Sequence, residues 1–311
     1  MEFVEGIRWE PGTTVRALVS GFRTLGFQST ELAKASAVMY KMWAQKAKVI
    51  LTFTSNMVSS GLRELFAQLV ELGLVDVVVT TAGSIEEDMM KAQGEKFPLT
   101  RFRADDIALH ERGHNRVGNI VITNDSYGRF EGLMKGLLDE IIEKKSELTG
   151  VELLRELGSR LKDRESILRQ AYLRRVPVFC PAITDGAMGF HLYMARDRHP
   201  DFHLDIVGDF KQLLFSLSPD DVKGLIALGG GVSKHFGLLA TMINGGADYA
   251  VYMTTSTGWS GSLSGASTDE AKSWGKIKDD SDSATVIGDV SINFPLASFH
   301  ALDRLHEEGR I

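Results

Sequence analysis

Short apolar segments alternate with helical segments along most of the 311 residues, and this alternation restricts the folds open to the chain. Strands that are apolar throughout are buried on both faces, and strands that alternate with helices pair in parallel. The pattern predicts an α/β protein, with a single doubly wound, mostly parallel sheet and helices on both faces. We expect its strands at 48–53, 74–80, 119–122, 176–179, 224–228 and 249–253.

The segments between these strands have helical spacing. Residues 31–46 carry apolar side chains on one face, and a further helix is predicted at about 58–73. Leucines at helical spacing between about 136 and 175 predict two amphipathic helices that cross to the next strand, with no chemistry of their own. Since no proline cluster, repeat or low-complexity run marks a boundary, we expect one domain spanning 1–311.

Charge and cysteine content restrict the partners and the compartment. A net charge of −6 argues against nucleic acid as the main partner and suits a cationic metabolite or a basic protein. Cys180 is the single cysteine, so an internal disulfide is impossible. The N-terminus lacks the features of a signal peptide, and no apolar run approaches the roughly 20 residues of a membrane helix. We therefore expect a soluble, cytoplasmic protein without a membrane partner.

One short motif suggests a metal site. His110-Glu111-Arg112-Gly113-His114 matches the His-Glu-x-x-His pattern of zinc proteases, whose two histidines lie one turn apart on a stable helix. Gly113 weakens such a helix, a strand is predicted almost at once, and no third ligand is suggested. We therefore predict no metal.

The stretch from Gly258 to Ile277 is the most specific part of the chain. A loop rich in glycine and serine leads to Glu270, Trp274 and Lys276. Glu270 and Trp274 are four residues apart and share a face of a helical turn, where a carboxylate and an indole suit a cationic ligand. Gly275 lets the chain leave the helix and direct the Lys276 amine to the same place. An amine held against apolar surface loses its proton more easily and becomes a nucleophile. The alternative is a surface helix with an ordinary solvated lysine.

Polar and glycine residues at the predicted strand ends suggest a dinucleotide site. Gly229-Gly230-Gly231 lies between a strand and a helix but lacks the full Gly-x-Gly-x-x-Gly spacing, so it is equally typical of a tight turn. Ser55, Asn56 and Ser59 could equally cap a helix. The residues alone leave these alternatives open.

Several blocks in a constant order resemble one family. The run Ser264-Gly265-Ala266, Glu270-Ala271 and Ser273-Trp274-Gly275-Lys276 is similar to the active-site segment of deoxyhypusine synthase. The resemblance continues from about residue 45 to about residue 300, and it is nearest to the short archaeal-type or bacterial synthase-like forms. The other blocks lie at 54–61, 80–88, 181–186, 228–235, 246–252 and 288–289.

The resemblance implies a Rossmann-like fold that binds NAD. Positions that match the family's cofactor residues lie at the expected strand ends, where parallel sheets bind ligands. They are Ser55, Asn56, Ser59, Thr81, Ala82, Gly83, Asp185, Gly230, Thr255, Ser256 and Asp289.

The resemblance also implies a polyamine pocket with Lys276 as the catalytic nucleophile and His235 as a candidate base. A lone histidine at a helix start is more often a packed or capping residue, and acids such as Glu86 and Glu87 are favoured in a first helical turn by the helix dipole. The substrate-binding positions implied are Glu86, Glu87, Tyr252, Gly261, Ser262, Glu270 and Trp274.

Three pocket positions depart from the eukaryotic pattern. Phe190 and Leu263 stand where the family has acids, and Leu239 stands where it has asparagine. Two missing carboxylates leave less charge for a triply cationic polyamine. The long N-terminal extension of the eukaryotic forms is also lacking. NAD-linked amine chemistry is thus better supported than spermidine itself.

The resemblance implies NAD-dependent transfer of the aminobutyl group of spermidine, through an imine on Lys276, to a lysine of translation initiation factor 5A. It also implies a homotetramer with active sites between paired subunits. One alternative is a related transferase that uses a small amine such as putrescine or agmatine, as in homospermidine formation. Another is a synthase-like subunit that only binds partners, against which the presence of Glu270, Trp274 and Lys276 together counts.

Overall fold

A central sheet of six strands, ordered β10-β9-β8-β1-β2-β6, organises the computed structural model, which describes residues 3–311. The registered pairs β8–β1, β8–β9, β9–β10 and β2–β6 are all parallel, so the predicted α/β class is confirmed. The strands are β1 (Lys48–Thr52), β2 (Val77–Val79), β6 (Val178–Phe179), β8 (Lys223–Leu228), β9 (Ala247–Thr254) and β10 (Ile277–Ile287).

The chain divides into two compact units, and each is described here by itself. The first unit comprises residues 3–53, 74–77 and 213–311 of the described chain. The second comprises residues 54–73 and 78–212. The expectation of a single domain remains a prediction.

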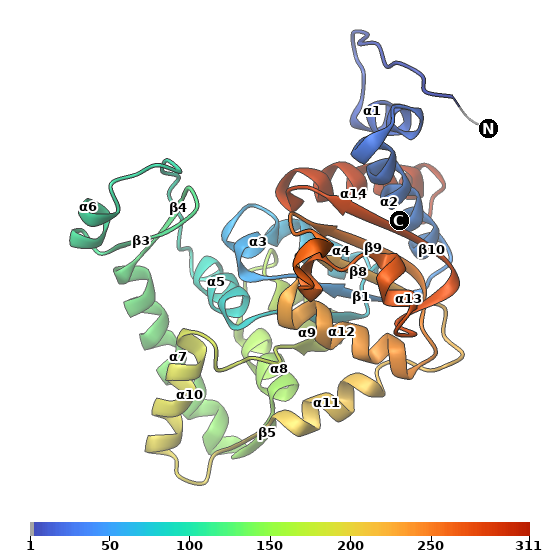
Figure 1. Ribbon diagram of the computed structural model, residues 1–311. Coiled ribbons are helices and arrows are strands. Elements are labelled where there is room, and N and C mark those ends of the chain that lie inside the picture. Colours follow the sequence, from blue (N-terminus) through green and yellow to red (C-terminus); the bar gives the residue numbers. More distant parts are fainter. Residues whose placement is uncertain (1–2) are drawn as a thin grey trace. The chain divides into compact units, whose positions relative to one another are not determined.

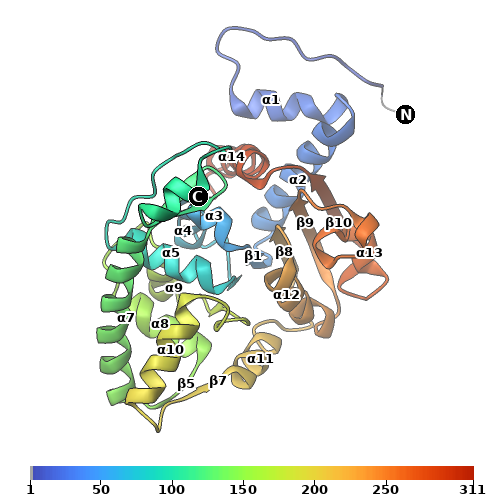
Figure 2. The same ribbon diagram turned by 60° about the vertical axis from the view of Figure 1, so that its left-hand side comes forward.

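In the first unit, helices cover the parallel strands β1, β8, β9 and β10. The residues of β8 are all buried and those of β1 and β9 nearly so, as strands covered on both faces require. Helices α2 (Phe27–Ala44) and α14 (Val290–Glu307) pack together on one side, and α12 (Gly231–Ile243) lies on the other (Figures 1 and 2). The short helices α1 (Val15–Gly21) and α13 (Thr268–Lys272) complete the unit, and α13 packs on β9 and β10.

The second unit is mainly helical, and α7 and α10 lie side by side in it (Figure 1). It also contains an antiparallel hairpin of β3 (His114–Val117) and β4 (Ile120–Thr123) and a parallel pair of β5 (Glu147–Thr149) and β7 (His203–Asp205). Its helices are α3 (Ser55–Ser59), α4 (Arg63–Glu71), α5 (Ala82–Ala92), α6 (Asp106–Glu111), α7 (Asn124–Lys144), α8 (Gly150–Arg160), α9 (Ile167–Arg174), α10 (Ala187–Arg198) and α11 (Ile206–Leu214).

A buried ion pair fastens three helices of the second unit. Arg63 on α4 donates to Asp88 on α5 at 2.6 Å, and both side chains are almost completely buried. Asp88 also accepts hydrogen bonds from the Ser166 hydroxyl and from the first-turn amides of Ile167 and Leu168, so it caps α9. The Nη2 atom of Arg63 donates to the Asp163 carboxylate at 2.6 Å. A full set of partners makes this buried charge tolerable.

Several predicted elements need correction. The strand expected at 119–122 belongs to the β3–β4 hairpin instead of the main sheet, because Gly118 turns the chain with a φ of +61°. The helix expected at 58–73 is two helices, α3 and α4. The stretch from 136 to 175 contains the end of α7, strand β5 and helices α8 and α9. No helix within residues 3–311 is both long and apolar enough to cross a membrane.

Candidate active site

Lys276 lies at the junction between a helix turn and the sheet of the first unit. Gly275 adopts a φ of +66°, a left-handed conformation in which glycine is favoured, and it ends the turn that follows α13. The Lys276 amide donates to the Ala271 carbonyl at 3.1 Å, the bond that closes a Schellman turn. The Lys276 carbonyl accepts from the Ala247 amide of β9 at 3.1 Å. The main chain of the lysine is therefore held on both sides.

The Lys276 side chain is buried, with 6% of its surface exposed. Its amine lies 5.0 Å from the centroid of the Trp274 ring. Burial lowers the pKa of the amine, and the negative charge of Glu270 partly opposes that shift. Because an amine must be uncharged to attack carbon, this environment favours a nucleophilic lysine.

A cavity of about 380 Å³ opens beside Lys276, entirely within the first unit. Glu270, Trp274 and Lys276 line it together, as their spacing in the sequence predicted. Glu270 is the single carboxylate among the described residues in its wall. The remaining lining is His235, Tyr252, Gly261, Lys234 and the apolar side chains of Leu238, Leu239, Met242, Leu263, Ala266 and Ala271.

Lys234 is a cavity residue that the sequence did not single out. Its amine donates to the carbonyls of Leu263 and Ala266, at 3.0 and 2.8 Å, and lies 4.1 Å from the centroid of the Tyr252 ring. Burial lowers its pKa to about 8, opposed by the negative charge of Glu270. The only signal in the sequence was its place in the first turn of a helix that follows three glycines. Lys234 therefore joins α12 to the loop at Leu263 and Ala266 and adds a second amine of lowered pKa to the cavity wall.

The Tyr252 hydroxyl is a candidate for hydrogen bonding to a bound molecule. It is buried in the cavity wall and has no hydrogen-bond partner among residues 3–311. Buried polar atoms are almost always satisfied, so a hydroxyl in this position suits a bound molecule. Burial also raises the pKa of Tyr252, and the hydroxyl therefore stays protonated and can donate.

The other predicted residues of this unit lie around the same cavity. His235, on the first turn of α12, is exposed and lines it. Gly261 lines it too, whereas the adjacent Ser262 caps a short 3-10 turn. Leu239 and Leu263 both contribute apolar wall. The first unit thus gathers most of the predicted site.

The remaining predicted pocket residues, Glu86, Glu87 and Phe190, belong to the second unit. The Glu86 carboxylate accepts from the Met188 amide at 2.8 Å, and burial raises its pKa. Burial raises the pKa of Glu87 to about 8, opposed by a hydrogen bond from Ser59, and one of its carboxyl oxygens has no partner in the described structure. Phe190 on α10 is 58% exposed. Glu87 is thus able to exchange a proton near neutral pH.

The predicted cofactor residues all follow the carboxyl end of a strand of the main sheet. In the second unit, Thr81 precedes α5 without making a side-chain cap, which leaves the amides of Ala82 and Gly83 available to a phosphate. Gly83 in that turn packs against Ser55, where a Cβ would be too close. Ser55, Asn56 and Ser59 lie on α3, and Asp185 is exposed in the turn after β6.

In the first unit, Gly230 precedes α12, whose first amide, that of Gly231, donates to the Ser264 hydroxyl at 3.0 Å. A Cβ at Gly230 would collide with Ser264, so only glycine fits at this position. Thr255 and Ser256 follow β9, and Asp289 follows β10. The uncapped start of α5 and the close-packed glycines suit a dinucleotide, whose phosphates need backbone donors.

Asp289 has a structural role as well. Its carboxylate caps α14 by accepting from the amide and the hydroxyl of Ser291, at 2.7 and 2.6 Å. The sequence did not indicate this cap, because the residue was assigned through the family motif alone.

The zinc-protease pattern does not form its usual geometry. His110 lies on α6, which ends at Glu111, and His114 opens strand β3 after the left-handed Gly113. The two imidazoles therefore do not share a helix, as that motif requires. Cys180 is buried, as expected for a strand end.

Comparison with known proteins identifies the family. The sequence profile of the deoxyhypusine synthase family matches residues 17–300. A protein of Aeropyrum pernix named "Probable deoxyhypusine synthase" is 40% identical over 303 residues, covering 96% of this chain and 98% of its own. One of the same name from Schizosaccharomyces pombe is 38% identical, covering 92% and 86%. The chain therefore belongs to the deoxyhypusine synthase family of transferases.

Solved structures agree on the fold. An Entamoeba histolytica protein assigned as a deoxyhypusine synthase superposes with a TM-score of 0.70 at 27% identity, covering 96% of this chain and 97% of its own. The ternary complex of AgrE with ornithine and NAD+ superposes with a TM-score of 0.55 at 12% identity, over 89% of this chain and 34% of that one. The second likeness shows the fold alone.

Proposed function

We propose that the chain transfers the aminobutyl group of spermidine to a lysine of translation initiation factor 5A, with NAD as cofactor. The observation that carries this proposal is the buried Lys276 amine, which lies beside Trp274 at the wall of a cavity and has a lowered pKa. A surface lysine with a salt-bridge role would need none of these features. Family membership supplies the reaction class.

Each residue of the cavity has a proposed part in the reaction. Once the secondary amine of spermidine has been oxidised to an imine, Lys276 would attack the imine carbon at the end of the aminobutyl portion, form an imine with that portion and release 1,3-diaminopropane. Glu270 pairs with a cationic end of the substrate, and Trp274 shields the imine from water. His235 or Glu87 handles the proton of the amine. Bound NAD supplies a store for hydride, taken up when the substrate amine is oxidised and returned when the final imine is reduced.

The residues at the strand ends are proposed to hold the cofactor. In the second unit, the uncapped start of α5 would offer backbone donors to a phosphate. Asp185 in the second unit and Asp289 in the first are acids of the kind that bind ribose hydroxyls. Support comes from the uncapped start of α5 in the second unit and, in each unit, from a glycine position where a Cβ has no room.

Trapping of the lysine imine tests the mechanism. The enzyme is incubated with NAD and with spermidine labelled in its butyl portion, then reduced with borohydride and digested. We expect label on the peptide that contains Lys276. Lys276→Arg should abolish it, whereas Lys272→Arg, on the same segment, should not. Label on no lysine, or undiminished label in Lys276→Arg, contradicts the proposal.

The apolar wall of the cavity favours a second candidate, transfer to or from a smaller amine such as putrescine or agmatine. Glu270 is the one carboxylate in that wall, while Leu239 and Leu263 replace polar groups of the wider family. A substrate with fewer charges would be desolvated at lower cost there. Parallel assays with factor 5A or putrescine as acceptor, and with spermidine or agmatine as donor, separate the two candidates. A subunit that only binds partners would produce no NADH with any amine.

We propose in addition that the chain assembles as a homotetramer in the cytoplasm. Trp259 and Trp274 are 96% and 64% exposed, and exposed apolar groups of this size suit a surface that another subunit covers. A second subunit over the cavity would also exclude water from the imine. The cytoplasm follows from the proposed protein substrate, a translation factor.

A further inference from the structure

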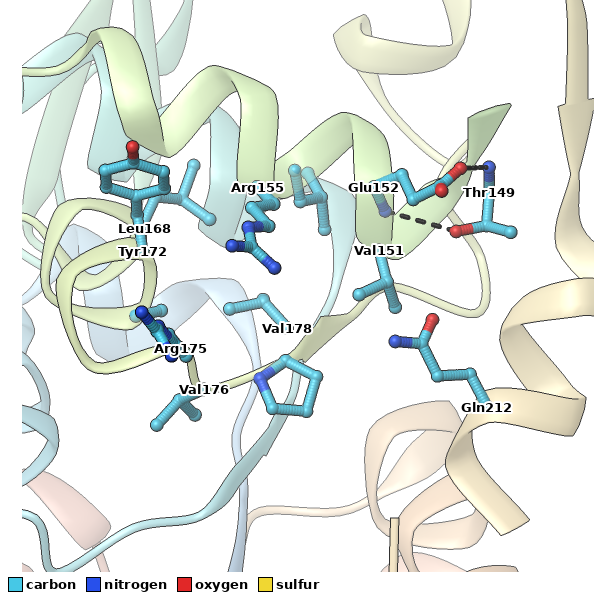
Figure 3. Close-up of a pocket in the computed structure, with 13 residues that line it drawn as sticks. Thr149, Val151, Glu152, Arg155, Leu168, Tyr172, Arg175, Val176, Val178 and Gln212 are labelled. Atoms are coloured by element: carbon cyan, nitrogen blue, oxygen red, sulfur yellow. Dashed lines mark hydrogen bonds between the residues drawn. The ribbon is translucent and has the colours of Figure 1, made fainter. Parts of the chain in front are cut away.

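A second cavity lies in the second unit, in the stretch for which the sequence predicted no chemistry. It has a volume of about 310 Å³ and lies between α8, α9 and the beginning of β6 (Figure 3). None of the residues assigned to NAD or substrate lines it. The predicted cofactor residue after β6, Asp185, follows the end of that strand, whereas Val176 and Pro177 precede its start.

Two arginines give this cavity a positive charge. Arg155 on α8 and Arg175 at the end of α9 both line it, and neither pairs with an acidic side chain in the described chain. Figure 3 draws both side chains on the side of the hollow away from Gln212. Two exposed guanidinium groups at one cavity repel each other unless an anion lies between them. An anion bound between the two groups would relieve this repulsion.

The one acidic residue in the described lining of this cavity is already engaged. Glu152 lines the cavity, but its carboxylate accepts from Lys145 at 2.7 Å and from the Thr149 amide at 3.0 Å. The surrounding stretch, residues 150–176, holds seven basic and four acidic residues in a chain whose net charge is −6. The positive potential is therefore local to this part of the surface.

The rest of the wall suits a flat or apolar group. Val151, Leu168, Val176 and Val178 form apolar surface, and the Tyr172 ring adds a face on which a planar group can stack. The Gln212 amide, at the far end in Figure 3, can both donate and accept. The volume falls at the lower end of the range for small-molecule pockets.

We propose that this cavity binds a small phosphate ester, with the phosphate held by Arg155 and Arg175 and an apolar or planar portion extending toward Gln212. Phosphate is favoured over carboxylate because two guanidinium forks can each take two oxygens of a phosphate, whereas a carboxylate has only two in all. The site is independent of the proposed amine transfer.

Calorimetric titration of the full chain, with saturating NAD present so that the proposed cofactor site is filled, tests this site with four probes. Adenosine 5′-monophosphate combines a phosphate with a planar group, inorganic phosphate and adenosine each carry one part, and benzoate replaces phosphate by carboxylate. We expect the nucleotide to bind more tightly than the other three. Arg155→Ala and Arg175→Ala should each weaken its binding by about tenfold or more.

Arg174→Ala is the matched control, because it removes the same charge from the neighbouring position, which does not line the cavity. The affinity of Arg174→Ala for the nucleotide should equal that of the unaltered protein. Nucleotide binding that Arg155→Ala and Arg175→Ala leave unchanged overturns the proposal, since the nucleotide then occupies another site. Benzoate that binds as tightly as the nucleotide, or no heat with the nucleotide at millimolar concentration, also overturns it.

Discussion

The amine of Lys276 lies 5.0 Å from the centroid of the Trp274 ring, although only Gly275 separates the two residues in the sequence. Residues two apart on a helix point in different directions, so a regular helix could not produce this contact. The left-handed Gly275 reverses the chain and places the amine over the indole. Glycine at this position is therefore part of the site.

Replacing Trp274 should lower the yield of the transfer product relative to that of the hydrolysis product. Trp274→Ala removes the ring beside the amine, so water should reach the proposed Lys276 imine and release the butyl group as a free aminoaldehyde. We expect the ratio of acceptor product to aldehyde to fall about tenfold or more, in line with about 1.4 kcal/mol or more of lost protection. Trp274→Phe should keep most of the ratio. Equal ratios in all three proteins would show that Trp274 does not shield the imine.

The pKa of Glu87 predicts how stability changes with pH. Burial raises the pKa from an ordinary 4.5 to about 8, so the folded chain holds a proton that the unfolded chain has released. This contribution to stability is complete below pH 4.5 and is lost as pH rises to about 8. Glu87→Gln has no such proton and should gain in melting temperature relative to the unaltered protein across that window. If the melting temperatures of the two proteins change in parallel from pH 5 to pH 9, the Glu87 carboxylate is solvated.

Substitution of Asp289 should have two effects that can be measured separately. Asp289→Ala removes the cap of α14 and should cost about 1 kcal/mol in urea denaturation. Asp289→Asn keeps a capping oxygen, so its stability should be near normal while NAD binding falls. Asp185→Ala, at an exposed position, should weaken NAD binding with no loss of stability. Normal NAD affinity in Asp289→Asn would leave Asp289 with its structural role alone.

The buried pair of Arg63 and Asp88 should dominate the stability of the second unit. Asp88→Ala leaves a buried guanidinium without its main partner and removes the cap of α9, so we expect a loss of about 3–5 kcal/mol. Asp163→Ala removes the partner at the more exposed end of the same arginine and should cost about 1 kcal/mol. Urea denaturation followed by circular dichroism compares the two. Similar losses would mean that burial does not set the strength of these contacts.

Assembly should depend on Trp259. Light scattering at assay concentration is expected to give the mass of a tetramer, and Trp259→Ser should shift it toward smaller species, because a 96% exposed indole in a monomer would be covered in the assembly. Phe102→Ser, which changes a side chain that is 72% exposed, is the control. A fully active monomer would rule out a site shared between subunits.

The sequence predicted the parallel sheet well, because buried parallel strands are apolar throughout and are bounded by glycine and polar turns. It missed β10, whose central residues alternate charged and small side chains and are partly exposed. It also placed 119–122 in the main sheet, since a four-residue apolar run does not reveal its partner. The sequence therefore predicted the strand itself but not its pairing with β3.

Much of the cavity beside Lys276 was predicted for a local reason. Glu270, Trp274 and Lys276 lie within seven residues of one another, so turn geometry alone brings them together. Lys234 and Met242 reach the same cavity from α12, a contact across the fold that no spacing encodes. The cavity beside Arg155 was missed for the same reason, because it depends on tertiary packing. The cap made by Asp289 is local, since it accepts from Ser291 two residues on, and it was missed because Asp289 was assigned through the family motif alone.

The main chain of Lys276 is hydrogen-bonded at both its amide and its carbonyl, and this has a consequence for how the substrate specificity of such enzymes can evolve. The amide is fixed by Ala271 and the carbonyl by the first residue of β9, so the amine takes its position from the sheet. Leu263 and its neighbours in the glycine-rich loop face the same cavity but make no main-chain bond to the lysine. Substitutions in that loop can therefore alter which amine is accepted without moving the reacting nitrogen, and new specificities could evolve with the chemistry intact.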